Sequence, residues 1–279
     1  MLLLKSHWAR AVAMLILSIL CLVSLYPFLY MLLMSLKSNH EILFTNPFGL
    51  PEKLYFQNYA NAWSKFDIPA YFKNSVSVTL LSVSSTVFFA TLFSYAVTRL
   101  KTKWSNAANS YISIGLFIPM QIILIPMVVL VKRWHMANTH LALIIPYIAF
   151  ELPFSCLIMY GFMRQIPREF EEAAYIDGAG VLRTFLQIIC PMLIPALSAA
   201  CLYAFIGVWN EFTVALIMIS EDSLKTLPLG LLNFKGQHET DWGGMGAAMI
   251  LATIPAVVLY MILGKQLEKA LSIGAGIKG

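Results

Sequence analysis

Charged residues are scarce in this 279-residue chain: Asp, Glu, Lys and Arg make up 12% of it, and 59% of its residues are hydrophobic. Ordinary soluble domains carry roughly 25% charged residues, so the composition excludes a typical soluble domain and indicates a membrane protein. The net charge of +5 could suit nucleic acid, but no basic face with interleaved aromatic residues accompanies it. We therefore expect a lipid bilayer, and not nucleic acid, as a partner.

The sequence also lacks the motifs of nucleotide, metal and nucleophile sites. No G-x-x-x-x-G-K-[ST] loop is present, so we do not expect the chain to bind ATP by itself. H-E-x-x-H and G-x-S-x-G are absent, and the five histidines form no ligand spacing. The four cysteines show no C-x-x-C pattern and lie in or beside apolar segments, so we expect small buried residues without a metal or redox role. These absences predict a protein that is not an enzyme and has no metal site.

Long apolar runs are abundant. Six segments reach the length of about 20 residues that a helix needs to cross the hydrocarbon core. They are Ala11–Met34, Ser75–Thr98, Ala108–Val131, Leu141–Met163, Met192–Ile219 and Gly244–Gly264. The first run is longer than the core of a signal peptide and has no convincing cleavage site, so we interpret it as a retained helix. The sequence predicts an all-α, polytopic membrane protein with six transmembrane helices.

Basic residues predict the orientation of these helices. With the termini inside, eleven lysines and arginines lie on the inner side and eight on the outer side, and the positive-inside rule favours that arrangement. Arg99, Lys101 and Lys103 cluster on the inner side, whereas Lys132 and Arg133 run against the rule. The expected organisation is a cytoplasmic N-terminus at 1–10, a transmembrane domain at 11–270 with an outer loop at 37–74 and an inner loop at 164–190, and a cytoplasmic tail at 271–279.

The most polar long interval between two apolar segments runs from Gln165 to Pro191. Pro167 suits the first turn of a helix, and three glutamates follow near the positive end of the helix dipole. Gly178 and Gly180 supply a flexible stop. Beyond them, four apolar residues recur at i, i+3, i+4 and i+7, which predicts one face of a second helix. These four are Leu182, Phe185, Leu186 and Ile189. The interval therefore predicts a helix, a glycine turn and a second helix at a membrane surface.

The run Glu172-Ala173-Ala174, followed by Gly178 and by an ending in Cys190-Pro191, resembles the EAA loop of the membrane subunits of bacterial ABC importers. In that family the motif ends in I-x-L-P, and Cys190 stands where leucine is usual. The resemblance implies a type I importer permease fold, in which this loop is a cytoplasmic coupling helix that docks in a groove of an ATPase subunit. The residues expected to contact the ATPase are Glu172, Ala173, Ala174, Asp177 and Gly178. The alternative is an ordinary exposed amphipathic loop helix.

Further landmarks are similar to those of the carbohydrate-type permeases, the subfamily that includes the maltose permeases. They include Asn58-Tyr59, Trp209-Asn210-Glu211-Phe212 and the ending Gly274–Gly279, and together they cover nearly the whole chain. The resemblance implies a permease subunit in a bacterial cell membrane that imports a sugar or oligosaccharide. It also implies three kinds of partner: a second permease forming a heterodimer, a dimer of ATPase subunits that bind ATP and Mg, and an extracytoplasmic solute-binding protein.

Three alternatives stay open at this point. Glycerol phosphate or a polyol could replace the sugar within the same subfamily. An ion-coupled secondary transporter would show paired broken helices in two related halves, and no internal repeat of that kind is visible in the sequence. A membrane scaffold without transport activity should tolerate the substitutions Glu172→Lys and Gly178→Asp.

Polar residues in the apolar segments are candidates for the substrate pathway. Glu151 lies near the middle of the fourth segment, where a carboxylate is costly. It either accepts hydrogen bonds from sugar hydroxyls, or is neutral or paired with another helix, in this chain or in a partner permease. Asn210 and Glu211 lie towards the outer end of the fifth segment, where they could form a gate, contact the solute-binding protein, or simply reach water.

Two further regions carry expectations. In the carbohydrate-type permeases a similar C-terminal tail reaches towards the ATPase dimer, so Gly276 and Lys278 are expected to contact the ATPase, with simple fraying of the terminus as the alternative. The outer loop from Ser220 to Trp242 is acidic but lacks the D-x-D-x-D-G spacing of a calcium loop, so a solvated face is favoured there.

Overall fold

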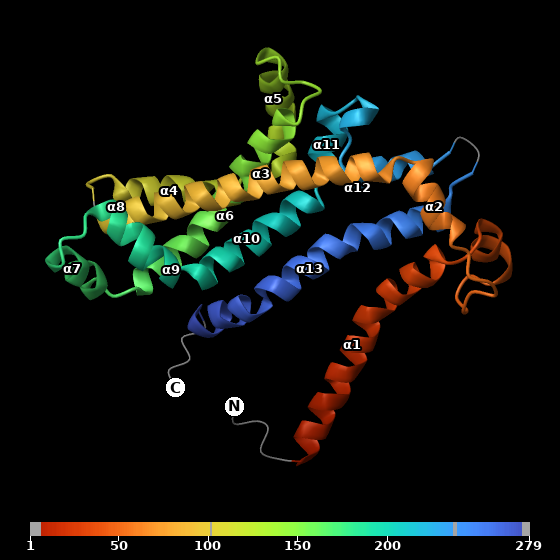
Figure 1. The fold of residues 1–279 in the computed structure, drawn as a ribbon, viewed down its shortest axis with the longest axis horizontal. Coiled ribbons are helices and arrows are strands. Elements are labelled where there is room, and N and C mark those ends of the chain that lie inside the picture. Colours follow the sequence, from red (N-terminus) through yellow and green to blue (C-terminus); the bar gives the residue numbers. More distant parts are fainter. Residues whose placement is uncertain (1–6, 101, 237–238, 275–279) are drawn as a thin grey trace. The chain divides into compact units, whose positions relative to one another are not determined.

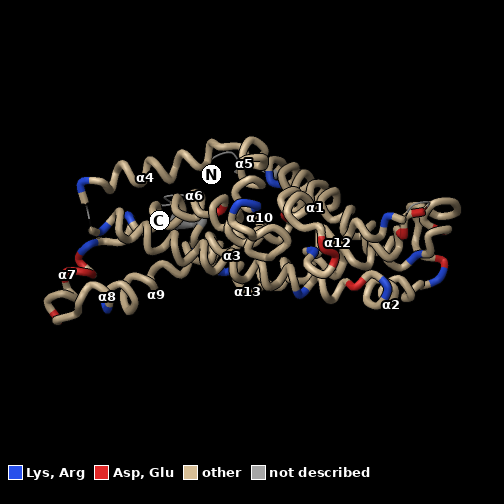
Figure 2. The backbone as a smooth tube through the Cα atoms, turned by 90° about the horizontal axis from the view of Figure 1, so that it is seen from above, with Lys and Arg blue, Asp and Glu red and all other residues tan. Residues whose placement is uncertain are grey.

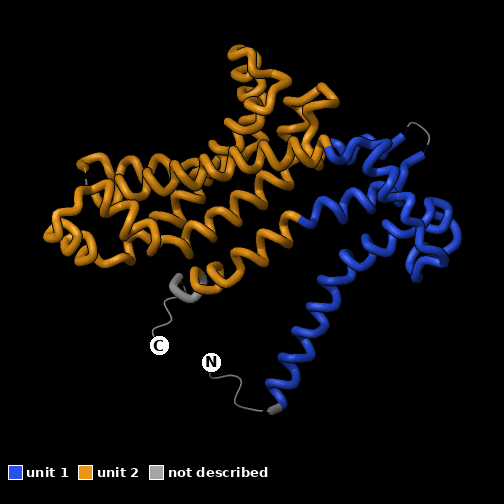
Figure 3. Tube along the Cα trace, in the orientation of Figure 1, with its two compact units in different colours: residues 1–69, 230–254 blue, residues 70–229, 255–279 orange. Residues whose placement is uncertain are grey.

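The computed structural model describes residues 7–100, 102–236 and 239–274 (Figure 1). Within these residues the chain is helical and contains no strand, only an isolated bridge between Lys235 and Thr240. The all-α prediction is therefore confirmed. The chain divides into two compact units, shown in Figure 3: unit 1 comprises Met1–Pro69 and Gly230–Ile254, and unit 2 comprises Ala70–Leu229 and Pro255–Gly279.

Unit 1 contains α1 (His7–Ser35), the π-helical turn η2 (Glu41–Thr45), α2 (Gln57–Ser64) and the 3-10 turn η7 (Leu231–Phe234). The most apolar window of α1 has no buried residue, so this helix offers its sides to lipid or to a partner chain. Cys21 on α1 is accordingly exposed, and the prediction that all four cysteines are buried is wrong for it.

The segment after α1 is held by buried polar groups. Lys37 is 1% exposed, and its Nζ donates to the carbonyl oxygen of Asn46 at 2.6 Å. The side-chain amide of Asn58 on α2 donates to the carbonyl oxygens of Ser35 and Lys37 at 2.9 and 2.8 Å. These bonds satisfy backbone acceptors that a helix end otherwise leaves open. Lys37 therefore serves this segment as a structural cation.

Unit 2 is built around α6 (Leu141–Gln165), which packs against α10 (Ile194–Trp209). Two apolar clusters fill this unit. One gathers buried residues such as Tyr147, Val208 and Met218, and the other gathers residues such as Met159 and Ile189. The long helix α3 (Ile68–Tyr95) lies along both clusters and continues into the π-helical turn η3 (Ala96–Leu100). The core thus joins α3, α6 and α10 along their length.

Four helices are long and apolar enough to cross a membrane: α1, α3 with η3, α6 and α13 (Trp242–Gly274). Two further helix pairs pass the same test together but are sharply bent. The described residues therefore hold four straight candidate spans, and six when each bent pair counts as one span. Each straight helix overlaps a predicted segment, although α3 begins well inside the stretch predicted as an outer loop.

The third predicted segment, Ala108–Val131, is not one helix. It is divided into α4 (Ser105–Ile114) with the 3-10 turn η4 (Gly115–Phe117), and α5 (Met120–Arg133), which are bent by 102°. Ile118 and Pro119 at the break have extended backbone conformations. The proline ring disfavours helical geometry at the preceding residue, which explains the break.

The fifth predicted segment, Met192–Ile219, is also interrupted. Helix α10 ends at Trp209, and a short helix α11 (Thr213–Met218) follows after three residues outside any helix. The segment before α10, which ends in α9 (Cys190–Met192), is bent by 73° from it. Pro195 stands in the first turn of α10, where proline is tolerated. The prediction of one continuous helix from Met192 to Ile219 is therefore wrong.

Candidate functional site

The polar interval forms a compact projection at one end of unit 2 (Figure 1). It consists of α7 (Glu169–Ile176), a turn, α8 (Val181–Thr184) and the π-helical turn η5 (Phe185–Ile189), which continues into α9. Figure 2 shows charged residues gathered around α7 and α8, whereas the tube of α4 carries almost none. The predicted order of helix, glycine turn and second helix is thus what the chain adopts.

Helix α7 has one exposed face and one buried face. The exposed face repeats at i, i+3, i+4 and i+7, the spacing of one side of a helix. Its members are Glu169, Glu172, Ala173 and Ile176. The Ile176 side chain is 86% exposed, although it is large and apolar. Glu171 and Ala174, on the other side, are buried. The exposed face therefore offers two carboxylates, a small central residue and an apolar tip.

The turn after α7 depends on Gly178. Its φ is +79°, a region that other residues adopt only with strain. The amide of Ala179 donates to the carbonyl of Ala174 at 2.9 Å, and the amide of Gly178 donates to that of Tyr175 at 3.1 Å. This pair of bonds is the Schellman motif, which satisfies the last carbonyl groups of a helix. The sequence prediction of a glycine stop is therefore confirmed at Gly178.

A buried charge pair holds α7 against the end of α3. Arg99 Nε and Glu171 Oε2 are 3.2 Å apart, and the two side chains are 7% and 8% exposed. The contact is a charge pair without the geometry of an aligned hydrogen bond, because Nε has no hydrogen-bond partner among the described residues. Arg99 also donates to the carbonyl of Ile166 at 2.8 Å. Sequence reasoning missed this pairing, since no local spacing connects residues so far apart in the chain.

Two other contacts connect the projection to the transmembrane helices. Arg168 donates to the carbonyl of Thr98 at 3.1 Å. The rings of Tyr95 and Phe185 have centroids 4.6 Å apart, and both side chains are buried. Of the predicted apolar face of the second helix, Phe185 and Ile189 are buried as expected, whereas Leu182 and Leu186 are exposed. The projection is thus attached to α3 and α6 at several points.

Glu151 lies on α6 beside α10. A Cβ placed on Gly207 would collide with its carboxylate, so the glycine is what allows this close approach. The Oε2 atom of Glu151 is buried and has no hydrogen-bond partner within the described part of the chain. A buried carboxyl oxygen without a partner is costly. The position is therefore compatible with both alternatives raised by the sequence: a group on a transport pathway that accepts hydrogen bonds from the substrate, or a carboxyl that is neutral or paired with another helix.

Asn210 and Glu211 occupy the break between α10 and α11. The Asn210 side chain is exposed and donates to the carbonyl of Ile206, within its own helix, at 2.9 Å. The Glu211 carboxylate accepts from the amides of Val214 and Ala215 at 2.7 and 3.2 Å, and from the Tyr147 hydroxyl at 2.6 Å. Glu211 therefore caps the start of α11 and ties it to α6, a structural task that its spacing in the sequence does not reveal.

The candidate residues thus fall into separate groups. Glu172, Ala173, Ala174, Asp177 and Gly178 lie together on α7 and its turn, although Ala174 is buried and faces the protein. Glu151 lies against Gly207 of α10, about one helical turn before Asn210 and Glu211. Gly276 and Lys278, expected to contact an ATPase, lie outside the described residues.

Comparison with known protein families identifies the family of this chain. Residues 87–273 match the family described as "Binding-protein-dependent transport system inner membrane component". This chain belongs to that family. It is therefore a membrane permease subunit, and the family assignment favours an importer over an ion-coupled secondary transporter.

The permease is similar to proteins named for sugar transport. It is 33% identical to the trehalose/maltose transport system permease protein MalG of Thermococcus litoralis over 268 residues, which cover 94% of each chain. It is 31% identical to the diacetylchitobiose uptake system permease protein NgcG of Streptomyces coelicolor over 250 residues, covering 89% of this chain and 82% of that one. Its fold matches a chain of a bacterial ABC transporter that imports the polysaccharide alginate, with a TM-score of 0.82 at 21% identity, covering 94% and 99% of the two chains.

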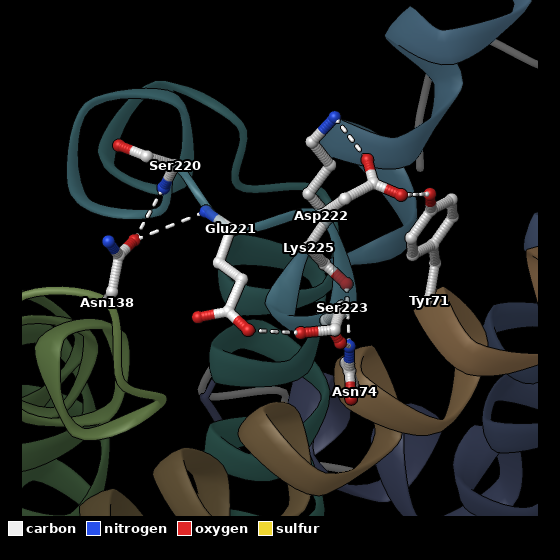
Figure 4. A network of polar contacts seen from close by, with 8 residues as sticks. All are labelled: Tyr71, Asn74, Asn138, Ser220, Glu221, Asp222, Ser223 and Lys225. Atoms are coloured by element: carbon white, nitrogen blue, oxygen red, sulfur yellow. Dashed lines mark hydrogen bonds and ion pairs between the residues drawn. The ribbon is translucent and has the colours of Figure 1, made fainter.

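At the other end of unit 2, a polar network holds the loop that the sequence predicts to be an outer loop (Figure 4). The loop carries the 3-10 turn η6 (Asp222–Leu224) and leads to α12 (Leu227–Gly230). Tyr71 donates to the Asp222 carboxylate at 2.7 Å, and Asn74 donates to two loop carbonyls at 2.8 and 2.9 Å. Asp222 also pairs with Lys225 at 2.7 Å. Asp222 is exposed, as expected of a solvated face, and it also anchors the loop to α3 through Tyr71.

Proposed function

We propose that this permease is the membrane subunit of an ATP-driven, binding-protein-dependent importer of sugars or oligosaccharides, and that an ATPase subunit grips α7. The observation that carries the proposal is the exposed face of α7. It combines carboxylates that can pair with basic groups, an alanine that permits close approach, and Ile176, an apolar side chain exposed to 86%.

The attachment of α7 supports a mechanical role. In this proposal the ATPase dimer binds ATP and Mg on separate chains and closes, which displaces α7. The buried Arg99–Glu171 pair and the Tyr95–Phe185 contact transmit the displacement to α3, and the Arg99–Ile166 bond transmits it to the end of α6. Tightly packed helices move as rigid bodies, so the transmembrane helices tilt between inward-open and outward-open states.

A sugar is the substrate that the relatives favour, since those reported above are named for trehalose, maltose and diacetylchitobiose. Glu151 would accept hydrogen bonds from sugar hydroxyls within the transport pathway. Glycerol phosphate and polyols are the competing substrates. The low charge of the chain suits a neutral sugar or polyol better than glycerol phosphate, which is an anion.

The proposal includes two further partners and an orientation. One chain supplies one coupling helix, so a second permease is expected to complete a heterodimer. A solute-binding protein would meet the outer face, where unit 1 has a polar cavity of about 510 Å³ lined by residues including Tyr55, Asn58, Asn61 and Asp241. The positive-inside rule would put α7 and both termini in the cytoplasm of a bacterial cell.

Substitution of Glu172 tests the proposal. Glu172→Lys reverses a charge on the exposed face of α7, and we expect the tagged permease to lose most of the ATPase that copurifies with it. Glu268→Lys is the matched control, because Glu268 is exposed on α13, outside the projection, and its change in charge is the same. Equal recovery of the ATPase with both variants would contradict the proposal.

Glu151 provides a second test, directed at the pathway. We expect Glu151→Gln to lower transport while assembly and membrane expression stay unchanged, because the amide keeps the size of the side chain and alters its hydrogen bonding. The measurement is uptake of labelled sugar compared with the amount of assembled complex. Normal transport by Glu151→Ala would show that the pathway assignment is wrong.

A further inference from the structure

A polar cavity of about 560 Å³ lies beside the attachment of α7, where the end of α3, the start of α4 and the end of α6 meet. Its lining is rich in arginine and in hydrogen-bonding side chains. The residues that line it are Val97, Thr98, Arg99, Thr102, Ser105, Asn106, Tyr160, Arg164 and Arg168. None of these residues belongs to the exposed face of α7, so the cavity is a separate site.

The charge in this cavity is not balanced. Arg99 pairs with Glu171, but Arg164 and Arg168 form no ion pair with any carboxylate of residues 7–100, 102–236 and 239–274. Arg168 donates one bond to the carbonyl of Thr98 at 3.1 Å. The Arg164 guanidinium lies 5.6 Å from the centre of the Tyr160 ring. Two positive charges in one cavity therefore stay available for an anion.

The donors fit a phosphate group. A guanidinium presents its N–H groups as a planar fork that matches phosphate oxygens in a bidentate manner. Neutral donors lie beside the two arginines. They are the hydroxyl groups of Thr102 and Ser105, whose oxygens are 3.2 Å apart, and the side-chain amide of Asn106. Basic pockets between transmembrane helices on the cytoplasmic side typically bind lipid head groups.

The surroundings favour a lipid over a soluble phosphate. Leu100 and Trp104 come next in the chain to lining residues, and they are 55% and 67% exposed. Tyr111 and Ile114 farther along α4 are also exposed. Tryptophan is enriched at membrane interfaces, at the depth of the head groups. The apolar residues of α4 could therefore lie along acyl chains while the arginines contact the phosphate.

We propose that this cavity binds the phosphate of an anionic phospholipid of the inner leaflet. The proposal rests on the cytoplasmic orientation of α7 given above. Arg99 and Arg168 line the cavity and also attach the α7 region to the end of α3. A phosphate at the cavity therefore acts on the residues that hold the coupling helix, and the anionic lipid content of the membrane regulates transport.

Lipid retention by the detergent-purified complex tests the proposal by native mass spectrometry. We expect phosphatidylglycerol to be retained more strongly than phosphatidylcholine. We expect Arg164→Gln to weaken its retention about tenfold, because a charge-assisted hydrogen bond is lost in addition to the nonspecific attraction of a basic residue near the membrane. Lys103→Gln is the matched control. It also removes one positive charge beside the cavity, but Lys103 is not one of the residues that line the cavity. Equal retention of both lipids, or an equal loss in both variants, would overturn the proposal.

Two further arms identify the ligand. Inorganic phosphate should not displace phosphatidylglycerol; displacement at millimolar concentration would make this a soluble-phosphate site and overturn the lipid assignment. Arg164→Gln should retain the ATPase, whereas loss of the ATPase with unchanged lipid retention would assign the cavity to a protein partner instead. Glu172→Lys should keep its lipid even if it loses the ATPase, so failure of the lipid site and failure of the coupling proposal are distinguishable.

Discussion

The substitution Gly178→Val is expected to lower the amount of ATPase captured by the permease about tenfold, because it strains the turn that follows α7. The φ of Gly178 is +79°, where a residue with a Cβ costs roughly 1–2 kcal/mol and a β-branched one more. A cost of 1.4 kcal/mol corresponds to about a factor of ten. Among the described residues, no heavy atom apart from those of Gly178 and its two chain neighbours lies within 4 Å of the position that a Cβ would take, so the expected effect comes from the backbone conformation.

Gly180 offers the control for this prediction. Apart from its chain neighbours, no heavy atom in the described part of the chain lies within 4 Å of its Cβ position either. Its φ is −77° and its ψ is 167°, an extended conformation that valine adopts readily. We expect Gly180→Val to capture the ATPase nearly as well as the unchanged permease. A similar loss in both variants would mean that bulk, and not backbone conformation, decides the result.

The second large effect concerns the buried pair of Arg99 and Glu171. Replacing either residue alone by methionine should lower the stability of the projection by about 3–5 kcal/mol, because the remaining charge would be buried without its partner. The double variant Arg99→Met/Glu171→Met should recover most of that loss, since two apolar side chains of similar volume can replace a buried pair at little cost. Protease cleavage of the 164–190 segment in the detergent-solubilised complex measures the stability of the projection directly.

The ATPase readout separates this role from general stability. If the pair transmits motion only by holding α7 in position, the double variant should capture the ATPase and support ATP hydrolysis stimulated by the substrate. Recovered protection from protease without recovered stimulation would show that the charges themselves take part in coupling. Resistance of both single variants to protease would contradict the assignment of a buried, stabilising pair.

The local features of the coupling segment could be predicted because their signals lie within a few residues. Pro167, the acidic first turn and the glycines predict helix α7 and its stop by capping rules that need no tertiary contact. The apolar runs that became α1, α3, α6 and α13 are long enough to be recognised by composition alone. The start of α3 was misplaced, since Pro69 lies in its first turn and not in a loop.

The breaks inside two of the predicted segments were missed for different reasons. At Ile118–Pro119 a local signal existed, because proline disfavours a helical residue before it. At Asn210–Phe212 the sequence stays apolar on both sides, and the break depends on Glu211. Its carboxylate caps α11 and accepts the Tyr147 hydroxyl of α6, a partner that no spacing in the sequence identifies.

By itself the sequence determined the helical class, the four unbroken membrane helices and a polar helix–turn–helix ending at Gly178, since hydrophobic length and capping are properties of consecutive residues. Only the tertiary structure decided that Glu171 is buried against Arg99 while Glu172 is exposed, that Gly207 makes room for Glu151, and that Arg164 and Arg168 share a cavity with the end of α3. Those relations join residues far apart in the chain, and they arise from how α3, α6 and α10 pack.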